Sequence, residues 1–246
     1  MMVADWLLAS DLDYTLLGDD RALERFAAWI RPRRQRLLLV YASGRHYESV
    51  VESIRSTALP NPNAVIGGVG TDVRYFPSGL PVPGWNDRLG DGWDARRVVE
   101  TLSSFSWLQP QPPESQTRFK VSFYATNLSD GSLREIQVAL WKSELSASLI
   151  YSSDRDLDVV PEGADKGSAV TFLAGHWRLS KDRVVVSGDS GNDLAMFQQD
   201  FRGVVVANAH QDLKDLAGPT VFVSRFSYAD GVLDGLRQWL SNDLEA

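Results

Sequence analysis

The sequence predicts an α/β protein with a doubly wound parallel-sheet core, interrupted by a small inserted α+β module. Short apolar runs alternate with amphipathic helical stretches in the first and last thirds of the 246-residue chain. These runs are β-branched or leucine-rich without polar alternation, which is typical of strands covered on both faces of a parallel sheet. The middle third departs from this rhythm, so we expect an insert there.

The composition indicates a soluble globular protein with a buried core, because 43% of the residues are hydrophobic and 23% are charged. The 25 Lys and Arg residues against 32 Asp and Glu residues give a net charge of −7, which repels a phosphate backbone and makes a nucleic-acid partner unexpected. The chain has no cysteine, which excludes disulfides, thiol nucleophiles and Cys-ligated metals and fits a reducing compartment.

The N-terminal segment lacks the pattern of an export signal, because Asp5 interrupts its apolar residues and no basic region precedes them. No uncharged apolar run approaches the roughly 20 residues that a membrane-spanning helix needs. We therefore expect a cytoplasmic protein without a membrane partner.

Six core strands are expected in chain order, at Val3–Ala9, Leu37–Ala42, Val65–Gly67, Val184–Ser187, Val204–Ala207 and Val221–Val223. Apolar residues recur at helical spacing between the strands, at Leu23, Phe26, Ala27 and Ile30 and again at Val50, Val51 and Ile54. A last core helix is expected at Val232–Leu240. Strands and helices in this alternation predict a core domain of residues 1–80 and 161–246.

The predicted insert, residues 81–160, is entered through a Pro/Gly-rich segment at 76–84 that we interpret as a hinge. Residues 118–124 alternate between polar and apolar, and residues 150–160 do so again around a turn at Ser153–Arg155. Ser132, with Glu135 three residues on, predicts the start of a helix between these strands. We expect this module to lie over the ends of the core strands like a lid, with one polar face of its sheet.

Polar residues follow three of the predicted core strands. Asp11 and Asp13 come after the first, Ser43-Gly44-Arg45 after the second, and Asp189-Ser190-Gly191-Asn192-Asp193 after the fourth. Lys166 stands where the chain leaves the insert and begins a helix. Ligands of open α/β sheets bind beyond the carboxyl ends of the strands, so we expect these residues to converge.

Four carboxylates in one cleft need a compensating positive charge, because like charges at short range raise each other's pKa. Lys166 supplies one charge, and oxygen-only ligands that leave room for water and phosphate favour Mg²⁺ as the other. The Ser43 hydroxyl, the Gly44 amide and the helix starts near Lys166 and Gly191 are donors suited to a phosphoryl group. The pattern predicts a phosphoryl-transfer site.

These residues are also compatible with other interpretations. Asp11 and Asp13 taken alone are equally typical of a helix cap or a turn. A calcium loop at 189–193 is disfavoured, because the segment lacks the Gly and Glu of an EF-hand. Lys166 could be an ordinary surface lysine. We interpret the cluster Arg31, Arg33, Arg34 and Arg36 as a solvated helix end rather than an anion site.

Taken together and in this order, the four segments resemble the four motifs of the haloacid dehalogenase superfamily of phosphohydrolases. The insert between the second and third motifs resembles the second, Cof-like cap type of that superfamily. Four longer stretches are similar to the bacterial sucrose-phosphate phosphatases, namely Leu7–Asp13, Tyr41–Arg45, Tyr151–Pro161 and Arg202–Asn208. Two departures are Ser43 where many relatives have Thr and Asp154 where a Gly is expected in the cap hairpin.

The resemblance implies roles for individual residues. Asp11 is expected to be the nucleophile, and Asp13 the general acid and then base. Ser43 is expected to hold a phosphoryl oxygen and Lys166 to neutralise the developing charge. Mg²⁺ is expected on Asp11, Asp189 and the Asp13 carbonyl, with Asp193 in support. The expected substrate-binding residues are Ser43, Gly44, Arg45, Lys120, Ser152, Asp156, Asp158, Lys166 and Asn192.

The expected function is that of a Mg²⁺-dependent phosphatase of a disaccharide phosphate, with sucrose 6-phosphate as the first candidate and an aspartyl-phosphate intermediate. Phosphates of trehalose, mannosylfructose or glucosylglycerol are alternative substrates. A non-catalytic sugar-phosphate sensor is a second class, disfavoured because the four motifs are intact. A receiver-type phospho-acceptor is a third class. It is disfavoured because receivers lack both the second Asp of the first motif and a cap of this size. We expect a monomer, with a sucrose-phosphate synthase as a conceivable partner.

Overall fold

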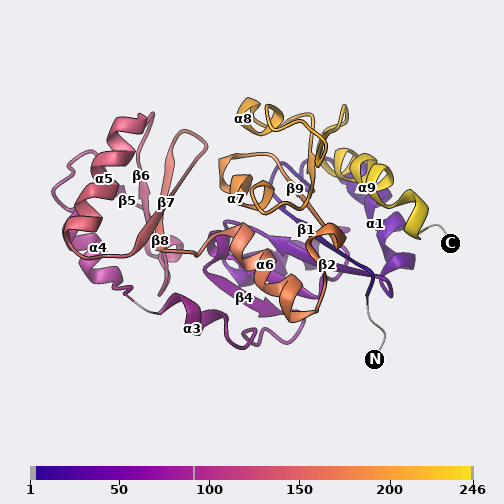
Figure 1. Cartoon of the computed structure of the whole chain (residues 1–246), viewed down its shortest axis with the longest axis horizontal. Coiled ribbons are helices and arrows are strands. Elements are labelled where there is room, and N and C mark those ends of the chain that lie inside the picture. Colours follow the sequence, from indigo (N-terminus) through magenta and orange to yellow (C-terminus); the bar gives the residue numbers. More distant parts are fainter. Residues whose placement is uncertain (1–3, 91, 245–246) are drawn as a thin grey trace.

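The computed structural model describes residues 4–90 and 92–244, which form two β-sheets with helices packed against them (Figure 1). The larger sheet has the strand order β11-β10-β9-β1-β2-β3-β4 and is parallel except for β4, which pairs antiparallel to β3. Its strands are β1 (Trp6–Ser10), β2 (Leu37–Ala42), β3 (Ala64–Gly67), β4 (Asp72–Tyr75), β9 (Val184–Gly188), β10 (Arg202–Val205) and β11 (Val221–Val223).

The strand order reverses at β1, because β2 extends the sheet on one side and β9 on the other. Ser10, the last residue of β1, is in register with Tyr41 of β2 and with Ser187 of β9. The loops that follow these three strands therefore leave the sheet at one level. This is the switch point at which doubly wound sheets bind ligands.

Helices cover both faces of this sheet. They are α1 (Asp20–Ile30), α2 (Tyr47–Ser56), α3 (Trp85–Leu89), α6 (Lys166–His176), α7 (Leu194–Phe197), α8 (Gln211–Lys214) and α9 (Tyr228–Leu244). Leu8 of β1 faces the cluster built by α1 and α9, whereas Leu7 and Ala9 face the cluster built with α6. Successive side chains of a strand point to opposite faces, so every residue of β1 is buried.

The predicted strands agree with the structure at Leu37–Ala42 and Val221–Val223. The first strand begins at Trp6, while Val3 lies outside the described residues. The fifth strand was predicted two residues too late, at Val204–Ala207. The observed strand β10 begins at Arg202, which pairs with Val185, and ends at Val205. The edge strand β4 was missed. Of its four residues only Val73 is buried, and Asp72 and Arg74 interrupt the apolar residues, so they give no apolar run.

The smaller sheet has the order β5-β6-β8-β7 and is antiparallel. Its strands are β5 (Gln109–Pro110), β6 (Val121–Tyr124), β7 (Ala147–Ser152) and β8 (Asp156–Pro161), and its helices are α4 (Ala95–Leu102) and α5 (Asp130–Lys142). Figure 1 shows these elements beside the core, on the side away from both termini. We call them the cap.

The alternation predicted for the cap strands is confirmed, because Val121, Phe123, Leu157 and Val159 all lie in one apolar cluster with α4 and α5. The hairpin turn predicted at Ser153–Arg155 is also present, with Asp154 at φ 49° in the left-handed region where a Gly was expected. The predicted helix start was wrong. Ser129 caps α5 by accepting from the Ser132 amide, which places Asp130 in the first turn, where a negative charge suits the helix dipole.

The apolar clusters show which segments pack together. The cap cluster includes buried residues from Val98 to Val159. Val82, Trp85 and Leu89 pack instead with strands of the large sheet. The division of the chain into a core of residues 1–80 and 161–246 and a cap of residues 81–160 stays a prediction. Among the described residues, no helix combines the length and the apolar character required to cross a bilayer.

Candidate active site

The predicted site residues converge at the switch point of the large sheet. Asp11 follows β1, and its amide donates to the carbonyl of Ser187 at 3.0 Å. Ser43 follows β2, and its amide donates to the carbonyl of Ile66 in β3 at 2.8 Å. Lys166 is the first residue of α6, which begins at the same edge. Each side chain is thus anchored through the backbone of a buried element.

Lys166 lies at the centre of the site with no exposed surface. Its Nζ donates to Asp11 Oδ1 at 2.7 Å, to Asp193 Oδ1 at 2.7 Å and to Asn192 Oδ1 at 2.8 Å. An ammonium has three hydrogens, so these contacts satisfy it completely. The surface-lysine interpretation is therefore wrong.

Asp193 is fully buried and has both carboxylate oxygens engaged. Oδ1 accepts from Lys166, while Oδ2 accepts from the amides of Asp189 at 2.9 Å and Ser190 at 3.2 Å. A carboxylate held by three donors shapes the loop after β9 and orients Lys166. Its neighbours Asp11 and Asp189 have oxygens available to a cation.

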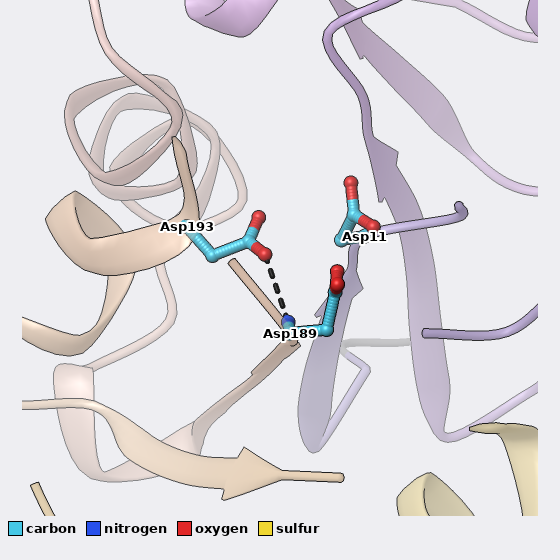
Figure 2. A group of neighbouring side chains, drawn as sticks. All are labelled: Asp11, Asp189 and Asp193. Carbon is cyan, nitrogen blue, oxygen red and sulfur yellow. Dashed lines mark hydrogen bonds between the residues drawn. The ribbon is translucent and has the colours of Figure 1, made fainter. Parts of the chain in front are cut away.

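Asp11, Asp189 and Asp193 form the acidic cluster, in which one oxygen of each lies within 4.8 Å of the others (Figure 2). All three are buried, and Thr15 Oγ1 donates to Asp189 Oδ1 at 3.1 Å. The donor set consists of oxygen atoms alone, which suits a hard divalent cation such as Mg²⁺. The cluster therefore fits the metal that the sequence predicts.

Asp13 was the fourth predicted metal residue, and its carboxylate does not join the acidic cluster. The side chain is half exposed and forms an ion pair with Arg45, with 2.9 Å between Asp13 Oδ2 and Arg45 Nε. Arg45 also donates from Nη1 to Ser53 Oγ at 2.9 Å, which fixes the guanidinium on α2. The resemblance assigns the Asp13 carbonyl, and not this carboxylate, as a metal ligand.

The electrostatics of the acidic cluster disfavour three free carboxylates. Burial raises the pKa of Asp11 to about 8, and the charges of Asp193 and Asp189 add to this rise while Lys166 opposes it. Burial, again with Asp193, raises the pKa of Asp189 to about 6. Burial acts against the charge of Lys166, yet Asp11 and Asp193 outweigh it and hold its pKa above the ordinary value. A bound divalent cation would favour the ionised carboxylates.

Two cavities meet at this site. One, of about 490 Å³, lies between the core and the cap, and the other, of about 430 Å³, surrounds Asp11, Asp13 and Asp189. Both are lined by Gly44, Arg45, Ser153 and Asn192. The larger cavity has the volume of a small-ligand site. Its walls include seven of the predicted substrate residues, Gly44, Arg45, Lys120, Ser152, Asp156, Asp158 and Asn192.

The remaining two predicted substrate residues, Ser43 and Lys166, are fully buried beneath the cavities. Ser43 Oγ accepts from the Arg45 amide at 3.1 Å, which leaves its hydroxyl hydrogen free to donate. The cap wall carries a buried polar group in which Asp158 Oδ1 accepts from Ser122 Oγ at 2.5 Å and from Lys120 Nζ at 3.3 Å.

Several residues of the site were missed by sequence reasoning. Gln111, from the loop after β5, donates to Asp156 Oδ1 at 3.0 Å and lines the larger cavity. Asn208 and His210 line the smaller one. Asn208 donates to the carbonyl of Tyr14 at 2.6 Å, so it braces the loop that carries Asp13. Asn208 is the last residue of Arg202–Asn208, the segment that is similar to the sucrose-phosphate phosphatases. That similarity was the only feature of the sequence that pointed to Asn208.

Comparison with known proteins identifies the family. The family model for sucrose-6F-phosphate phosphohydrolase matches residues 4–240. The chain belongs to this family. A sucrose-phosphatase from Synechocystis sp. PCC6803, solved in complex with sucrose and phosphate, has a TM-score of 0.90 at 29% identity, covering 96% of this chain and 98% of that one. The expected α/β fold and the membership of the haloacid dehalogenase superfamily are thus confirmed.

Two relatives of this sucrose-6F-phosphate phosphohydrolase family member are named as phosphatases. A mannosylfructose-phosphate phosphatase of Agrobacterium fabrum is 38% identical over 238 residues, covering 95% of this chain and 96% of the relative. Sucrose-phosphatase 2 of Nicotiana tabacum is 33% identical, and the match covers 84% of this chain and 51% of the tobacco protein. The chain is a phosphatase of the haloacid dehalogenase superfamily, as the four motifs predict.

Proposed function

We propose that this phosphatase hydrolyses a disaccharide phosphate, with sucrose 6-phosphate as the first candidate, through an aspartyl-phosphate intermediate. One observation carries the proposal: Lys166 binds the Asp11 carboxylate at 2.7 Å, where a cavity around the acids joins the polar cavity beneath the cap. A phosphoryl group beside Asp11 would leave the sugar against Lys120, Asp156 and Asp158.

In the first step, a carboxylate oxygen of Asp11 attacks phosphorus and the bond to the sugar oxygen breaks. Protonated Asp13 gives its proton to that oxygen, and the free sugar leaves. In the second step, the Asp13 carboxylate takes a proton from water, whose oxygen attacks phosphorus. The bond between phosphorus and the Asp11 oxygen breaks, which restores the Asp11 carboxylate and releases inorganic phosphate. Lys166 and the Ser43 hydroxyl oppose the negative charge that gathers on the phosphoryl oxygens.

The residues that would hold Mg²⁺ are Asp11 and Asp189 through their side chains and Asp13 through its carbonyl, with Asp193 positioning the loop. The ion would supply positive charge opposite the phosphoryl oxygens. This assignment is supported by the oxygen-only donor set and by the raised pKa values of Asp11 and Asp189.

Removal of divalent metal is expected to abolish phosphatase activity, and added Mg²⁺ to restore it. At about 100 times its dissociation constant, Mg²⁺ should raise the melting temperature by about 5–10 °C, because it binds only the folded site. Calorimetry with and without Mg²⁺ measures this shift without any substrate. The Asp189→Asn variant should lose the shift, whereas Asp20→Asn, on the exposed start of α1, should keep it. Full activity in excess chelator would contradict the metal assignment.

Asp13→Asn is expected to lower kcat by about 10²- to 10⁴-fold, the usual range for losing a general acid and base. With p-nitrophenyl phosphate, whose leaving group needs little protonation, the variant should release one equivalent of nitrophenolate in a burst and then turn over slowly. Rapid-mixing absorbance kinetics distinguish the two phases. Because Asp13 is half exposed, the melting temperature should change little. Unchanged steady-state turnover would reject the assignment.

Mannosylfructose phosphate is a second candidate substrate, favoured by the 38% identity with the Agrobacterium fabrum phosphatase. Both candidates join a hexose to fructose, so the phosphorylated half can occupy the same place against Gly44 and Asn192. The choice then depends on cap residues facing the other hexose. Trehalose and glucosylglycerol phosphates stay as further alternatives. A sensor role is disfavoured because Asp11, Asp13, Lys166 and Asp189 are all present.

The experiment that tests the proposal is phosphate release with Mg²⁺ from sucrose 6-phosphate, mannosylfructose phosphate, trehalose 6-phosphate and p-nitrophenyl phosphate. A kcat/KM for sucrose 6-phosphate at least tenfold above the other sugars supports the first candidate. A preference for another sugar phosphate would replace sucrose 6-phosphate as the substrate and would leave the proposed reaction unchanged. Release from none of the four overturns the proposal and favours the sensor.

The proposal also covers the oligomeric state, the cellular compartment and a partner enzyme. We expect a monomer in the cytoplasm, in line with a chain that has no cysteine. A glycosyl-transferring synthase is the partner class that would deliver the sugar phosphate. Size-exclusion chromatography with light scattering, alone and mixed with such a synthase, tests both expectations.

A further inference from the structure

Val69 adopts a backbone conformation that β-branched residues avoid. Its φ is 56° and its ψ is 24°, in the left-handed region, and its side chain is 2% exposed. The neighbours Gly68 and Gly70 also have positive φ values, of 56° and 113°. Glycine tolerates such values, whereas valine is strained by them. A strained residue persists only where its surroundings hold it in place, so the contacts of this loop matter.

The loop that contains Val69 supports the turn after β2. The Val69 amide donates to the carbonyl of Ser43 at 3.1 Å, and the Gly68 amide donates to the carbonyl of Arg45 at 2.9 Å. Both ends of the turn Ser43–Arg45 are therefore hydrogen-bonded to two successive left-handed residues. The dihedral angles of Gly68 set the relative orientation of these two amides, whereas those of Val69 direct the chain from this turn onward to Gly70.

The Val69 side chain supports the same turn from below. A Cβ built on Gly44 would lie 3.6 Å from Val69 Cγ1, which is van der Waals contact, and both residues line the larger cavity. The next residue approaches the lysine helix, because a Cβ on Gly70 would lie 2.3 Å from the Asp165 carbonyl carbon. Asp165 caps α6, whose first residue is Lys166. The loop thus touches two elements that face the phosphoryl group.

We propose that Val69 is a positioning residue for phosphate, whose strained conformation holds the Ser43–Arg45 turn at its distance from Lys166. This inference rests on the proposed function, since it concerns binding of the phosphoryl group by that turn. The Cγ1 methyl group of Val69 points toward Gly44, and the Val69 amide donates to the Ser43 carbonyl. Without the Val69 side chain, the Ser43–Arg45 turn would shift toward the vacated space, and its contacts with phosphate would weaken.

The test compares Val69→Ala and Val69→Gly with the same changes at Val73, which is 1% exposed, lies in β4 and belongs to the same apolar cluster. Both Val69 variants are expected to raise KM for the sugar phosphate and the inhibition constant of inorganic phosphate about tenfold. Their kcat should change less than threefold. The shape-conserving Val69→Thr should restore both constants, and Val73→Ala should leave them unchanged.

Melting temperatures provide the second readout. Glycine relieves the left-handed strain, so Val69→Gly should melt above Val69→Ala, whereas Val73→Gly should melt below Val73→Ala. Unchanged phosphate inhibition in both Val69→Ala and Val69→Gly, or no recovery in Val69→Thr, overturns the inference. Failure of the wild-type protein to hydrolyse any phosphate monoester overturns the proposed function instead, and phosphate binding measured by calorimetry then tests Val69 independently.

Discussion

Asp11→Asn is expected to lower kcat by about four orders of magnitude or more, because an amide cannot form the acyl phosphate of the proposed mechanism. The side chain keeps its shape, and Lys166 can still donate to its oxygen. The buried site should therefore remain assembled. Phosphate release at saturating substrate measures the loss, and a residual rate within tenfold of wild type would reject Asp11 as nucleophile.

The same substitution has an expected effect on stability. In the metal-free protein, burial raises the pKa of Asp11 from 3.8 to about 8, so between these pH values the folded state holds a proton that the unfolded chain has released. The contribution of Asp11 to stability is present below about pH 4 and is lost as the pH rises toward 8. Asp11→Asn removes that loss, so at pH 8 the metal-free variant should melt above the wild type. Melting below wild type at every pH would contradict this account.

Lys166→Met is expected to lower the free energy of unfolding by about 3–5 kcal/mol, because it leaves buried carboxylates without their counter-charge. For a chain of this length the melting temperature should fall by roughly 6–20 °C. We also expect kcat to fall by about 10²- to 10³-fold, as when a donor to developing charge is lost. Thermal unfolding and steady-state kinetics measure the two effects separately.

Two controls sharpen this result. Lys181→Met removes an exposed lysine whose ion pair with Asp200 spans 3.5 Å, and it should change neither quantity measurably. The double variant Lys166→Met/Asp193→Asn removes one buried charge of each sign and should recover part of the lost stability. A double variant no more stable than Lys166→Met alone would show that charge compensation is not the reason for the loss.

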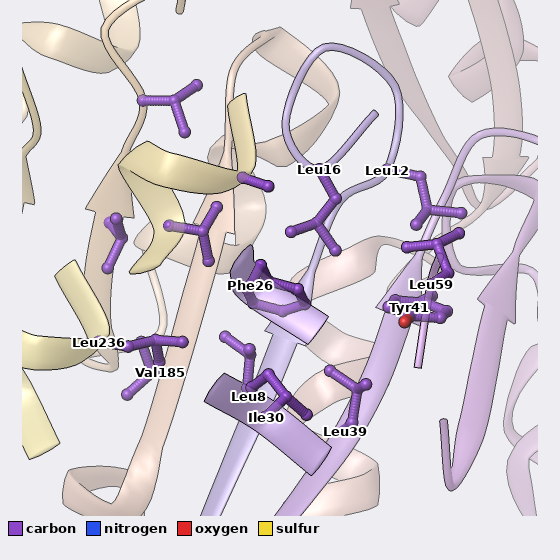
Figure 3. Close-up of a cluster of buried hydrophobic side chains, with 14 of the residues drawn as sticks. Leu8, Leu12, Leu16, Phe26, Ile30, Leu39, Tyr41, Leu59, Val185 and Leu236 are labelled. Atoms are coloured by element: carbon purple, nitrogen blue, oxygen red, sulfur yellow. The ribbon is translucent and has the colours of Figure 1, made fainter. Parts of the chain in front are cut away.

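Much of the core could be predicted because its helices repeat apolar residues at helical spacing. Figure 3 shows Phe26 and Ile30 of α1 near Leu8 of β1, and Leu236 of α9 belongs to the same apolar cluster. This pattern depends only on the turn of the helix and the alternation of the strand, so it is visible without contacts. The edge strand of the large sheet could not be predicted in this way. β4 pairs with β3 through its backbone, and Asp72 and Arg74 separate its apolar residues, so no continuous apolar run marks it.

The candidate site could be predicted as a set of residues, because parallel strands bring the loops that follow them to one edge. Their individual contacts could not. Asp13 and Asp11 are two residues apart, yet Asp13 pairs with Arg45 at the surface while Asp11 is buried against Lys166. Val69 carried no signal either, since its left-handed backbone follows from hydrogen bonds to Ser43 and from its flanking glycines.

Apolar periodicity and chain order specify the elements of a doubly wound sheet, so the amino-acid sequence alone shows which chemical groups stand at which strand ends. Which of these groups touch depends on how the elements pack in the folded protein. Lys166 and Asp11 lie 155 positions apart in the chain and 2.7 Å apart in the site. That proximity arises from sheet register and helix packing, which are collective properties of many residues. The burial that follows from it raises the pKa of Asp11 and makes the site suited to a cation.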